Sequence, residues 1–402
     1  MSVWDALVGQ PAVVATLSAA AEAATRVPGE GPLAAARAGM THSWLFTGPA
    51  GSGRSVAARA FAAALSCRRR PVGCGECVGC RTVLAGTAAD VRVVRPEGLS
   101  IGVAEVRALV RDAASAPAAG PWRVLLLEDA DRLTEQAANA LLKALEEPAD
   151  RAVLLLCAPS TEDVLPTVRS RCRVVPLTPP AAAEVAAVLS REGVDPALAA
   201  LAAQAAQGHV GRARRLATDE AARARRAEVL RLPTRLRSVA DCLAAAADLV
   251  AAATEEAEQA TATRDEQEAE ALRTALGAGG SGGTGRGRAK AVAVRGAAGM
   301  IKDLERAQKS RGKRSQLDAL DRALVDLAGW YRDVLVVQLG APVELVHPDQ
   351  GRLTGSLARA SAPEQTLRRV EAVVACREAL AGTPGLAPLL AVESLALALR
   401  AG

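Results

Sequence analysis

The chain of 402 residues is long enough for two or three domains, and 50% of its residues are hydrophobic, so it can bury sizeable cores and is not a disordered protein. It has no long, strongly apolar run of the kind that spans a membrane. The start, MSVWDALVGQ, lacks the basic and apolar regions of a secretory signal. We therefore expect a cytoplasmic protein. The net charge of +5 suits an anionic partner without specifying one, and 2% aromatic residues leave few rings on which bases could stack.

Residues 44 to 175 alternate short apolar runs with helical periodicity, which is typical of a parallel α/β domain. Strands are predicted at 44–48, 90–96, 123–131 and 152–160, and helices at 55–66, 103–110 and 134–148. Beyond residue 180 strands nearly vanish. A small helical unit is predicted over 181–217, followed by long helices over 225–275 and 317–341. The glycine-rich stretch 277–290 is predicted to be flexible.

A candidate phosphate-binding loop follows the first strand. Its residues are Gly48, Pro49, Ala50, Gly51, Ser52, Gly53, Arg54 and Ser55. The spacing G-x4-G-[KR]-[ST], placed between a strand and a helix, is the context that such a loop requires. Glycines let backbone N–H groups curl around phosphates, the helix N-terminus adds positive potential, and Ser55 is placed to reach Mg²⁺. The alternative is a glycine-rich turn that does not meet nucleotide.

Two departures from an active loop occur together. Arg54 stands where lysine normally acts as a compact charge between phosphates, and a planar guanidinium suits that slot badly. After the strand at 123–131, Glu128 precedes Asp129, the reverse of the usual order of metal-side and water-orienting acids. Lysine is only five of the 49 basic residues, so compositional drift could explain Arg54 alone, but it does not explain the acids. Together, the arginine at position 54 and the reversed order of the two acids favour a site that is not selected for hydrolysis. They also make ATP and Mg²⁺ binding doubtful.

Four cysteines lie between the first helix of the loop and the next strand. Cys67, Cys74, Cys77 and Cys80 follow the pattern C-x6-C-x2-C-x2-C. Two overlapping C-x2-C steps suit a tetrahedral Zn²⁺ held by four thiolates, with no open position for catalysis, so a structural zinc site is predicted. Disulfides are the alternative, which a reducing cytoplasm disfavours.

Several segments together resemble the AAA+ clamp-loader subunits of bacterial DNA polymerase III. They are VGQ (8–10), HSWLFTGPAGSGRS (42–55), the four-cysteine insert, LLLEDADRLTEQAANALLKALEEP (125–148) and LPTVRSRC (165–172). A degenerate phosphate loop, a zinc insert after its helix, the ANALLKALEEP helix and the SRC triplet are hard to find together elsewhere. The resemblance covers about residues 1 to 217, and the remainder resembles that family only as a helical collar.

The resemblance implies roles for particular residues. It assigns the phosphate-loop positions to Gly48 through Ser55 and the zinc ligands to the four cysteines. It gives Arg171 of the SRC triplet the role of an arginine finger offered to a neighbouring subunit, whereas a surface arginine paired with a nearby acid is the alternative. The second sensor arginine of active members would fall near Gly211 and Arg212.

The expected architecture is an α/β AAA+ module with a zinc insert, a helical lid and an all-α collar. We place the AAA+ domain at 1–178 with the insert at 67–80, the lid at 179–222 and the collar at 223–402. The degenerate loop resembles the delta-prime branch of the family, which implies a non-hydrolysing member of a hetero-oligomeric ring with gamma/tau-type and delta-type subunits. The ring would load the sliding clamp onto primed DNA.

Two other functions are considered. An ATP-hydrolysing gamma/tau-type subunit would differ at Arg54 and at the order of Glu128 and Asp129. A stand-alone zinc-dependent DNA-binding ATPase is disfavoured by the low aromatic content and the lack of a strong basic stripe in the sequence. The run KSRGKRS at 309–315 could touch DNA phosphates, but such runs are more often solvated.

Overall fold

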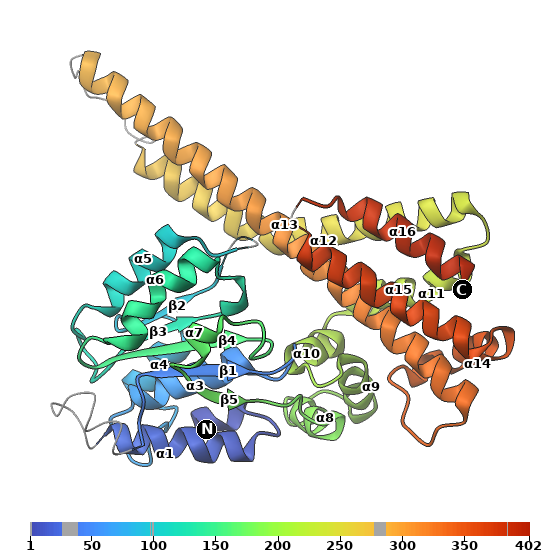
Figure 1. Cartoon of the computed structure of the whole chain (residues 1–402), viewed down its shortest axis with the longest axis horizontal. Coiled ribbons are helices and arrows are strands. Elements are labelled where there is room, and N and C mark those ends of the chain that lie inside the picture. Colours follow the sequence, from blue (N-terminus) through green and yellow to red (C-terminus); the bar gives the residue numbers. More distant parts are fainter. Residues whose placement is uncertain (1, 26–38, 97, 99, 277–286, 384) are drawn as a thin grey trace. The chain divides into compact units, whose positions relative to one another are not determined.

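The computed structural model describes residues 2–25, 39–96, 98, 100–276, 287–383 and 385–402. The chain divides into two compact units, Met1–Asp219 and Glu220–Gly402 (Figure 1). Within the described ranges, no helix is long and apolar enough to cross a membrane.

A parallel sheet forms the centre of the first unit. Among the described residues it has five strands in the order β2-β3-β4-β1-β5. The strands are β1 (Ser43–Thr47), β2 (Val91–Val94), β3 (Arg123–Leu127), β4 (Ala152–Ala158) and β5 (Arg173–Pro176). Every residue of β1 and β4 is buried, as expected for central strands covered on both faces. The predicted α/β class with a parallel sheet is confirmed.

Helices cover both faces of this sheet. One face, with Trp44 and Phe46 of β1, packs on α1 (Pro11–Ala24) and the alanine-rich α3 (Arg54–Leu65). Trp44 meets Phe61 edge-on, with ring centroids 4.9 Å apart. The other face packs on α5 (Val103–Ala113) and α6 (Glu135–Glu146). Short elements complete this part: η1 (Val3–Ala6), α4 (Val78–Leu84), η2 (Ala130–Arg132) and α7 (Pro166–Arg169).

Three small helices close the first unit. They are α8 (Ala182–Arg191), α9 (Pro196–Ala206) and α10 (Val210–Thr218). Their contact surfaces are largely alanine, which lets the three helix backbones approach closely. The side chain of Gln10, from the VGQ segment, donates a hydrogen bond to the carbonyl of Thr178 just before these helices. The sequence motif therefore ties the N-terminal segment to the start of the helical part.

Among its described residues, the second unit contains helices and the turns that connect them, and no strand. Its helices are α11 (Glu220–Arg235), α12 (Val239–Ala275), α13 (Gly287–Leu339), α14 (Gly351–Ala360), α15 (Pro363–Gly382) and α16 (Pro388–Ala401), with a turn η3 (Pro348–Gln350). The core gathers Trp330, Tyr331 and Leu324 of α13 with α12, α15 and α16. Most of the glycine-rich stretch, 277–286, lies outside the described residues, and its last residues, 287–290, begin α13.

A buried polar cluster organises the turn after α13. Asp333 is fully buried and accepts hydrogen bonds from the backbone N–H of Val346 (2.9 Å) and of His347 (2.7 Å). His347, also fully buried, contacts Arg226 of α11 through its ring. Arg226 in turn pairs with Asp349 at 3.1 Å. Buried polar groups of this kind fix one arrangement of the chain because each has a partner.

We expect Asp333→Ala to destabilise the second unit by about 2–6 kcal/mol, since the backbone N–H groups of Val346 and His347 lose their acceptor. Asp321→Ala is the matched control, because Asp321 pairs with Arg377 at the surface, at 2.8 Å, and should cost less than about 1 kcal/mol. Urea unfolding followed by circular dichroism measures both. Equal effects of the two substitutions would contradict this account of the cluster.

Candidate functional site

The candidate phosphate loop connects β1 to α3 at the carboxyl end of the strand. Its glycines adopt φ values that favour glycine, with Gly51 at 89° and Gly53 at 88°. A Cβ on Gly51 would lie 2.7 Å from the Cβ of His209, which precedes α10. A side chain at Gly51 would therefore be excluded both by backbone conformation and by the small helices of the first unit. His209, which no sequence motif predicted at this site, packs directly on the loop.

Arg54 turns back onto its own loop. Its guanidinium donates a hydrogen bond to the carbonyl of Gly48, with Nη1 and O separated by 2.6 Å. The side chain thus spans the loop from the first residue of α3 to the end of β1. This contact occupies an N–H group of Arg54 that could otherwise donate a hydrogen bond to a phosphate.

The two acids after β3 are held differently from the way a metal site requires. The Glu128 carboxylate accepts from Arg59 Nη2 at 2.7 Å and from Arg95 Nε at 2.9 Å, and its side chain is 13% exposed. Asp129 has a φ of 56°, and its carboxylate lies 3.9 Å from Arg132. Neither arginine partner of Glu128 was among the predicted site residues, because the residues that face a strand end depend on the fold.

These residues do not fit ATP with Mg²⁺. Hard cations need carboxylate oxygens that are free to coordinate, and the Glu128 oxygens already balance two guanidinium groups. Burial raises the pKa of nearby Asp131, and repulsion from Asp129 adds to the rise. The loop has the backbone geometry of a phosphate site. However, Arg54 is hydrogen-bonded to the Gly48 carbonyl, and Glu128 is paired with Arg59 and Arg95.

The four predicted cysteine ligands come together. The Sγ atoms of Cys67, Cys74, Cys77 and Cys80 all lie within 4.8 Å of one another. Cys67 Sγ is 3.7 Å from Cys74 Sγ and 3.8 Å from Cys77 Sγ. Tetrahedral coordination with Zn–S bonds of about 2.3 Å sets the edge between two sulfurs at about 3.8 Å. The cluster can therefore hold a metal ion.

Backbone geometry supports thiolates in this cluster. The N–H of Cys77 donates to Cys74 Sγ, and the N–H of Cys80 donates to Cys77 Sγ, each at 3.4 Å. Although burial opposes it, the N–H of Cys80 and a backbone contact from Arg68 lower the pKa of Cys77 to about 6. Burial raises the pKa of Cys80. Cys77 also caps the N-terminus of α4, so the same backbone turn positions a ligand and starts a helix.

The insert also holds the start of the chain. The N–H of Val3 donates to the carbonyl of Gly73 at 2.9 Å, and the Ser2 hydroxyl donates to the same oxygen at 3.0 Å. The indole of Trp4 donates to the carbonyl of Val72 at 3.3 Å. The N-terminal η1 therefore docks on the cysteine insert.

Arg171 follows α7 and faces the surface. Its Nη2 lies 2.5 Å from a carboxylate oxygen of Glu146 at the end of α6, and its side chain is 37% exposed. Its Nη1 also donates to the carbonyl of Thr167 at 2.9 Å. Arg171 is thus paired with an acid in this chain, at a position from which it remains accessible.

The region of the second sensor arginine lies at the start of α10. The backbone N–H of Arg212 donates to His209 Nδ1 at 3.2 Å, so His209 caps this helix. Since His209 packs on Gly51, the first turn of α10 adjoins the phosphate loop. The assignment of a sensor to Gly211 or Arg212 stays a prediction.

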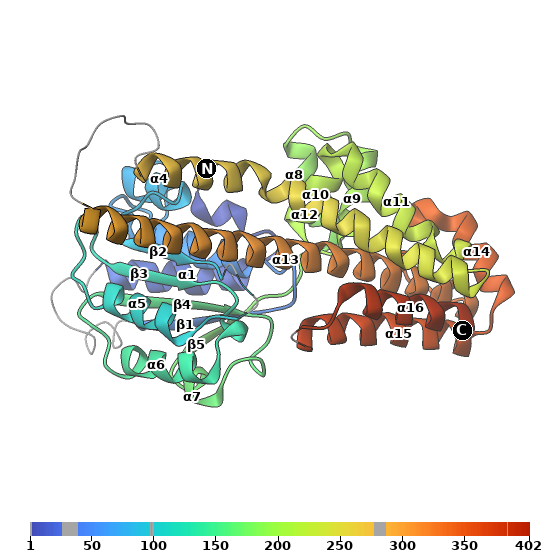
Figure 2. The ribbon, with the colours of Figure 1, turned by 90° about the horizontal axis from the view of Figure 1, so that it is seen from above.

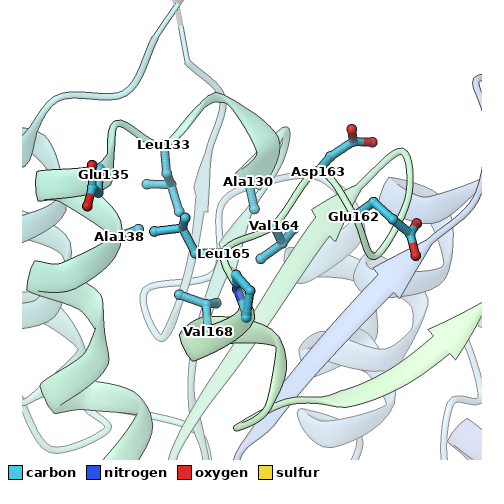
Figure 3. A pocket seen from close by; sticks show the side chains of 10 residues that line it. Ala130, Leu133, Glu135, Ala138, Glu162, Asp163, Val164, Leu165 and Val168 are labelled. Atoms are coloured by element: carbon cyan, nitrogen blue, oxygen red, sulfur yellow. The ribbon is translucent and has the colours of Figure 1, made fainter.

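A pocket of about 180 Å³ lies beside the loop that follows β4 (Figure 3). Its floor is formed by apolar side chains of Leu133, Leu165 and Val168, while Glu162 and Asp163 sit on the rim and point outward. It includes no residue of the phosphate loop and no cysteine of the cluster. The pocket is therefore separate from both predicted sites.

A family model and several relatives that match the chain describe subunits of DNA polymerase III. The family model described as DNA polymerase III, delta subunit, matches residues 33–181. The DNA polymerase III subunit delta' of Pseudomonas aeruginosa is 43% identical over 140 residues, which are 34% of this chain and 43% of that protein. The subunit delta' of Bacillus subtilis is 30% identical over 194 residues, 48% of this chain and 59% of that protein. The subunit gamma/tau of Mycobacterium tuberculosis is 33% identical over 195 residues, 47% of this chain and 31% of that protein.

The family model lies within the first unit and spans the phosphate loop and the cysteine cluster. The chain covers less than two thirds of the length of each of these relatives.

Proposed function

Since the chain is similar to delta-prime subunits of bacterial DNA polymerase III, we propose that it is a delta-prime-like clamp-loader subunit that does not hydrolyse ATP. It would act in DNA replication, within a hetero-oligomeric ring of gamma/tau-type and delta-type subunits that loads the sliding clamp onto primed DNA. Residues 1–178 would serve as the AAA+ domain, 179–222 as the lid and 223–402 as the collar through which the ring assembles.

The observation that carries this proposal is that two charged residues of the phosphate site, Arg54 and Glu128, are bound by other groups of the same chain. Arg54 is bound to Gly48, and Glu128 is bound to Arg59 and Arg95. Hydrolysis requires a cation at the β- and γ-phosphates and a carboxylate free to orient water. In this chain the guanidinium of Arg54 and the metal-side carboxylate of Glu128 already have partners within the chain, which supports the proposal of a subunit that does not hydrolyse ATP.

Zinc is the ion that we assign to the cysteine cluster. Four thiolates at tetrahedral spacing with no open position are typical of a structural zinc site. When bound, zinc would cross-link the insert through Cys67, Cys74, Cys77 and Cys80. The chain's own residues then use the insert as the platform for η1.

Arg171 is the residue that we assign to a neighbour's reaction. An AAA+ ring places nucleotide at subunit boundaries, where a guanidinium can neutralise charge that develops on the γ-phosphate. The pair with Glu146 is partly exposed, and exposed pairs contribute about 1 kcal/mol or less. Little free energy would therefore be lost if the Arg171 guanidinium left Glu146 and bound the γ-phosphate at a neighbouring subunit.

A gamma/tau-type ATPase is the second candidate, favoured by the 33% identity to the gamma/tau subunit of Mycobacterium tuberculosis. The two candidates differ in the activity of the isolated chain.

We expect the purified chain to show no ATP turnover above background in a phosphate-release assay. Arg54→Lys should not create turnover, because Glu128 stays bound to Arg59 and Arg95. Arg54→Ala, the matched variant, should also leave the baseline unchanged. Turnover by the purified chain that Arg54→Ala abolishes would establish the gamma/tau-type ATPase instead.

A further inference from the structure

Helices α12 and α13 form a two-helix rod in the second unit (Figure 2). Hydrogen bonds and ion pairs join the two helices as far as residues 265–268 of α12 and 308–311 of α13. Gln308 donates to the carbonyl of Asp265 at 3.0 Å, and Arg311 binds the Glu268 carboxylate through two contacts of 3.0 and 2.5 Å. The hydrogen bond from Arg311 is the main reason that the pKa of Glu268 falls to about 2. Arg311 therefore faces inward, and its charge is used within the rod.

Four other cations of α13 face outward. Lys302, Arg306, Lys309 and Lys313, which we call the basic stripe, are all exposed. Their spacing of four, three and four residues places them on one face of the helix. At 1.5 Å per residue the stripe is about 16 Å long.

Most side chains of the basic stripe have no ion pair among the described residues, so their charge can act on a ligand. In the described part of the chain none of its three lysines has a carboxylate at ion-pair distance. Arg306 lies 3.4 Å from Asp303, but both side chains are more than 70% exposed, so the pair is weak. Asp303 and Glu305 are the acids beside the stripe on its own helix. On α12, Asp265 and Glu268 are bound to Arg311, Glu270 pairs with Arg273 at 2.6 Å, and Glu266 is exposed. On its own helix the stripe therefore carries four cations against two acids.

The choice of lysine indicates what the stripe binds. Four of the five lysines of the chain lie between 290 and 313, although arginine is by far the commoner cation. Protein–protein interfaces are enriched in arginine and aromatic residues and depleted in lysine. Lysine acts on phosphate as a point charge that needs no fixed geometry. Residues 239–315 contain no aromatic residue, so they offer no platform for unpaired bases.

We propose that the basic stripe binds the phosphate backbone of double-stranded DNA without regard to sequence. A duplex is straight on this scale and presents one phosphate per strand for each 3.4 Å or so of axis, so a rigid line of cations can follow it. The stripe lies outside the α/β domain, and it can bind duplex in the isolated chain whether or not the chain is a clamp-loader subunit.

The test uses the full chain and a fluorescein-labelled 20-base-pair duplex, with anisotropy measured over a series of NaCl concentrations. The variant combines Lys302→Gln, Lys309→Gln and Lys313→Gln, because glutamine keeps helix propensity and side-chain length while removing charge. The matched control combines Arg231→Gln, Arg352→Gln and Arg359→Gln, three exposed cations elsewhere in the same unit. Both variants change net charge equally.

We expect the slope of log affinity against log salt to fall by about 0.9 for each lysine removed, and the control to keep the parent slope. The proposal is wrong if the lysine variant binds like the parent, or if the control loses as much as the lysine variant. Stripe-dependent binding of poly-glutamate without binding of duplex would assign the surface to an acidic protein and also overturn it. Should the triple variant lose helicity, Lys302→Gln and Lys313→Gln singly are each expected to lower the slope by about 0.9, and no change would reject the proposal.

Discussion

Cys77→Ser is expected to reduce bound zinc from one ion per chain to a small fraction of that, and to destabilise the first unit by about 4 kcal/mol or more, as loss of a structural metal does. The other three thiolates cannot complete a tetrahedron without it, and the N–H of Cys80 loses its sulfur acceptor. Because η1 docks on the insert, the amide of Val3 should also lose protection against hydrogen exchange.

Cys172→Ser serves as the matched control. Cys172 is likewise half-buried, but it lies outside the cluster. We expect it to retain one zinc per chain and the parent protection of Val3. Elemental analysis of freshly purified protein decides the first point and mass-spectrometric hydrogen exchange the second. Substoichiometric metal in the parent, or an unchanged zinc content in Cys77→Ser, would refute the zinc assignment.

Arg171→Ala is expected to leave folding and ring assembly intact while lowering the DNA-stimulated ATPase of the assembled loader and its clamp loading. A finger supplied in trans is worth about 10³ to 10⁵ in rate at the site that it completes. The effect on total turnover will be smaller, because only one site of several depends on this chain. Arg171→Lys should restore little, since an ammonium does not reproduce the planar fork of donors.

Two variants separate a finger from a surface ion pair. Arg169→Ala removes a neighbouring arginine of α7 and should leave the loader unaffected. Glu146→Gln releases Arg171 from its carboxylate partner and should preserve or increase activity. If Glu146→Gln impairs the loader as much as Arg171→Ala does, the ion pair itself is what matters, and Arg171 has no role in the neighbouring site.

The sequence was a good guide to the central sheet. The strands that became β1, β3 and β4 contain runs of three or more consecutive apolar residues, which are typical of strands buried on both faces. The edge strand β5 was not predicted, because it has only four residues, is mostly exposed, and contains only two apolar residues between Arg173 and Pro176. The helix α13 begins within the glycine-rich stretch, where composition alone favours a flexible chain.

The two predicted sites differ in how much the sequence could tell. The cysteine cluster was found complete, because its ligands are close in the chain and their spacing fixes the turn. At the phosphate loop the unusual Arg54 and Glu128 were identified, but their partners were not. Arg59 and Arg95 reach Glu128 across 69 and 33 residues of sequence. Contacts at such separation depend on the strand order, which no local pattern specifies.

Reconstitution tests the central claim most directly. A loader is assembled from the gamma/tau-type and delta-type subunits of the same organism, with and without this chain, and clamps loaded onto primed circular DNA are counted per unit time in the presence of ATP. The account predicts that loading depends on this chain, although the chain alone turns over no ATP. Equal loading by the ring that lacks it would contradict the proposed function.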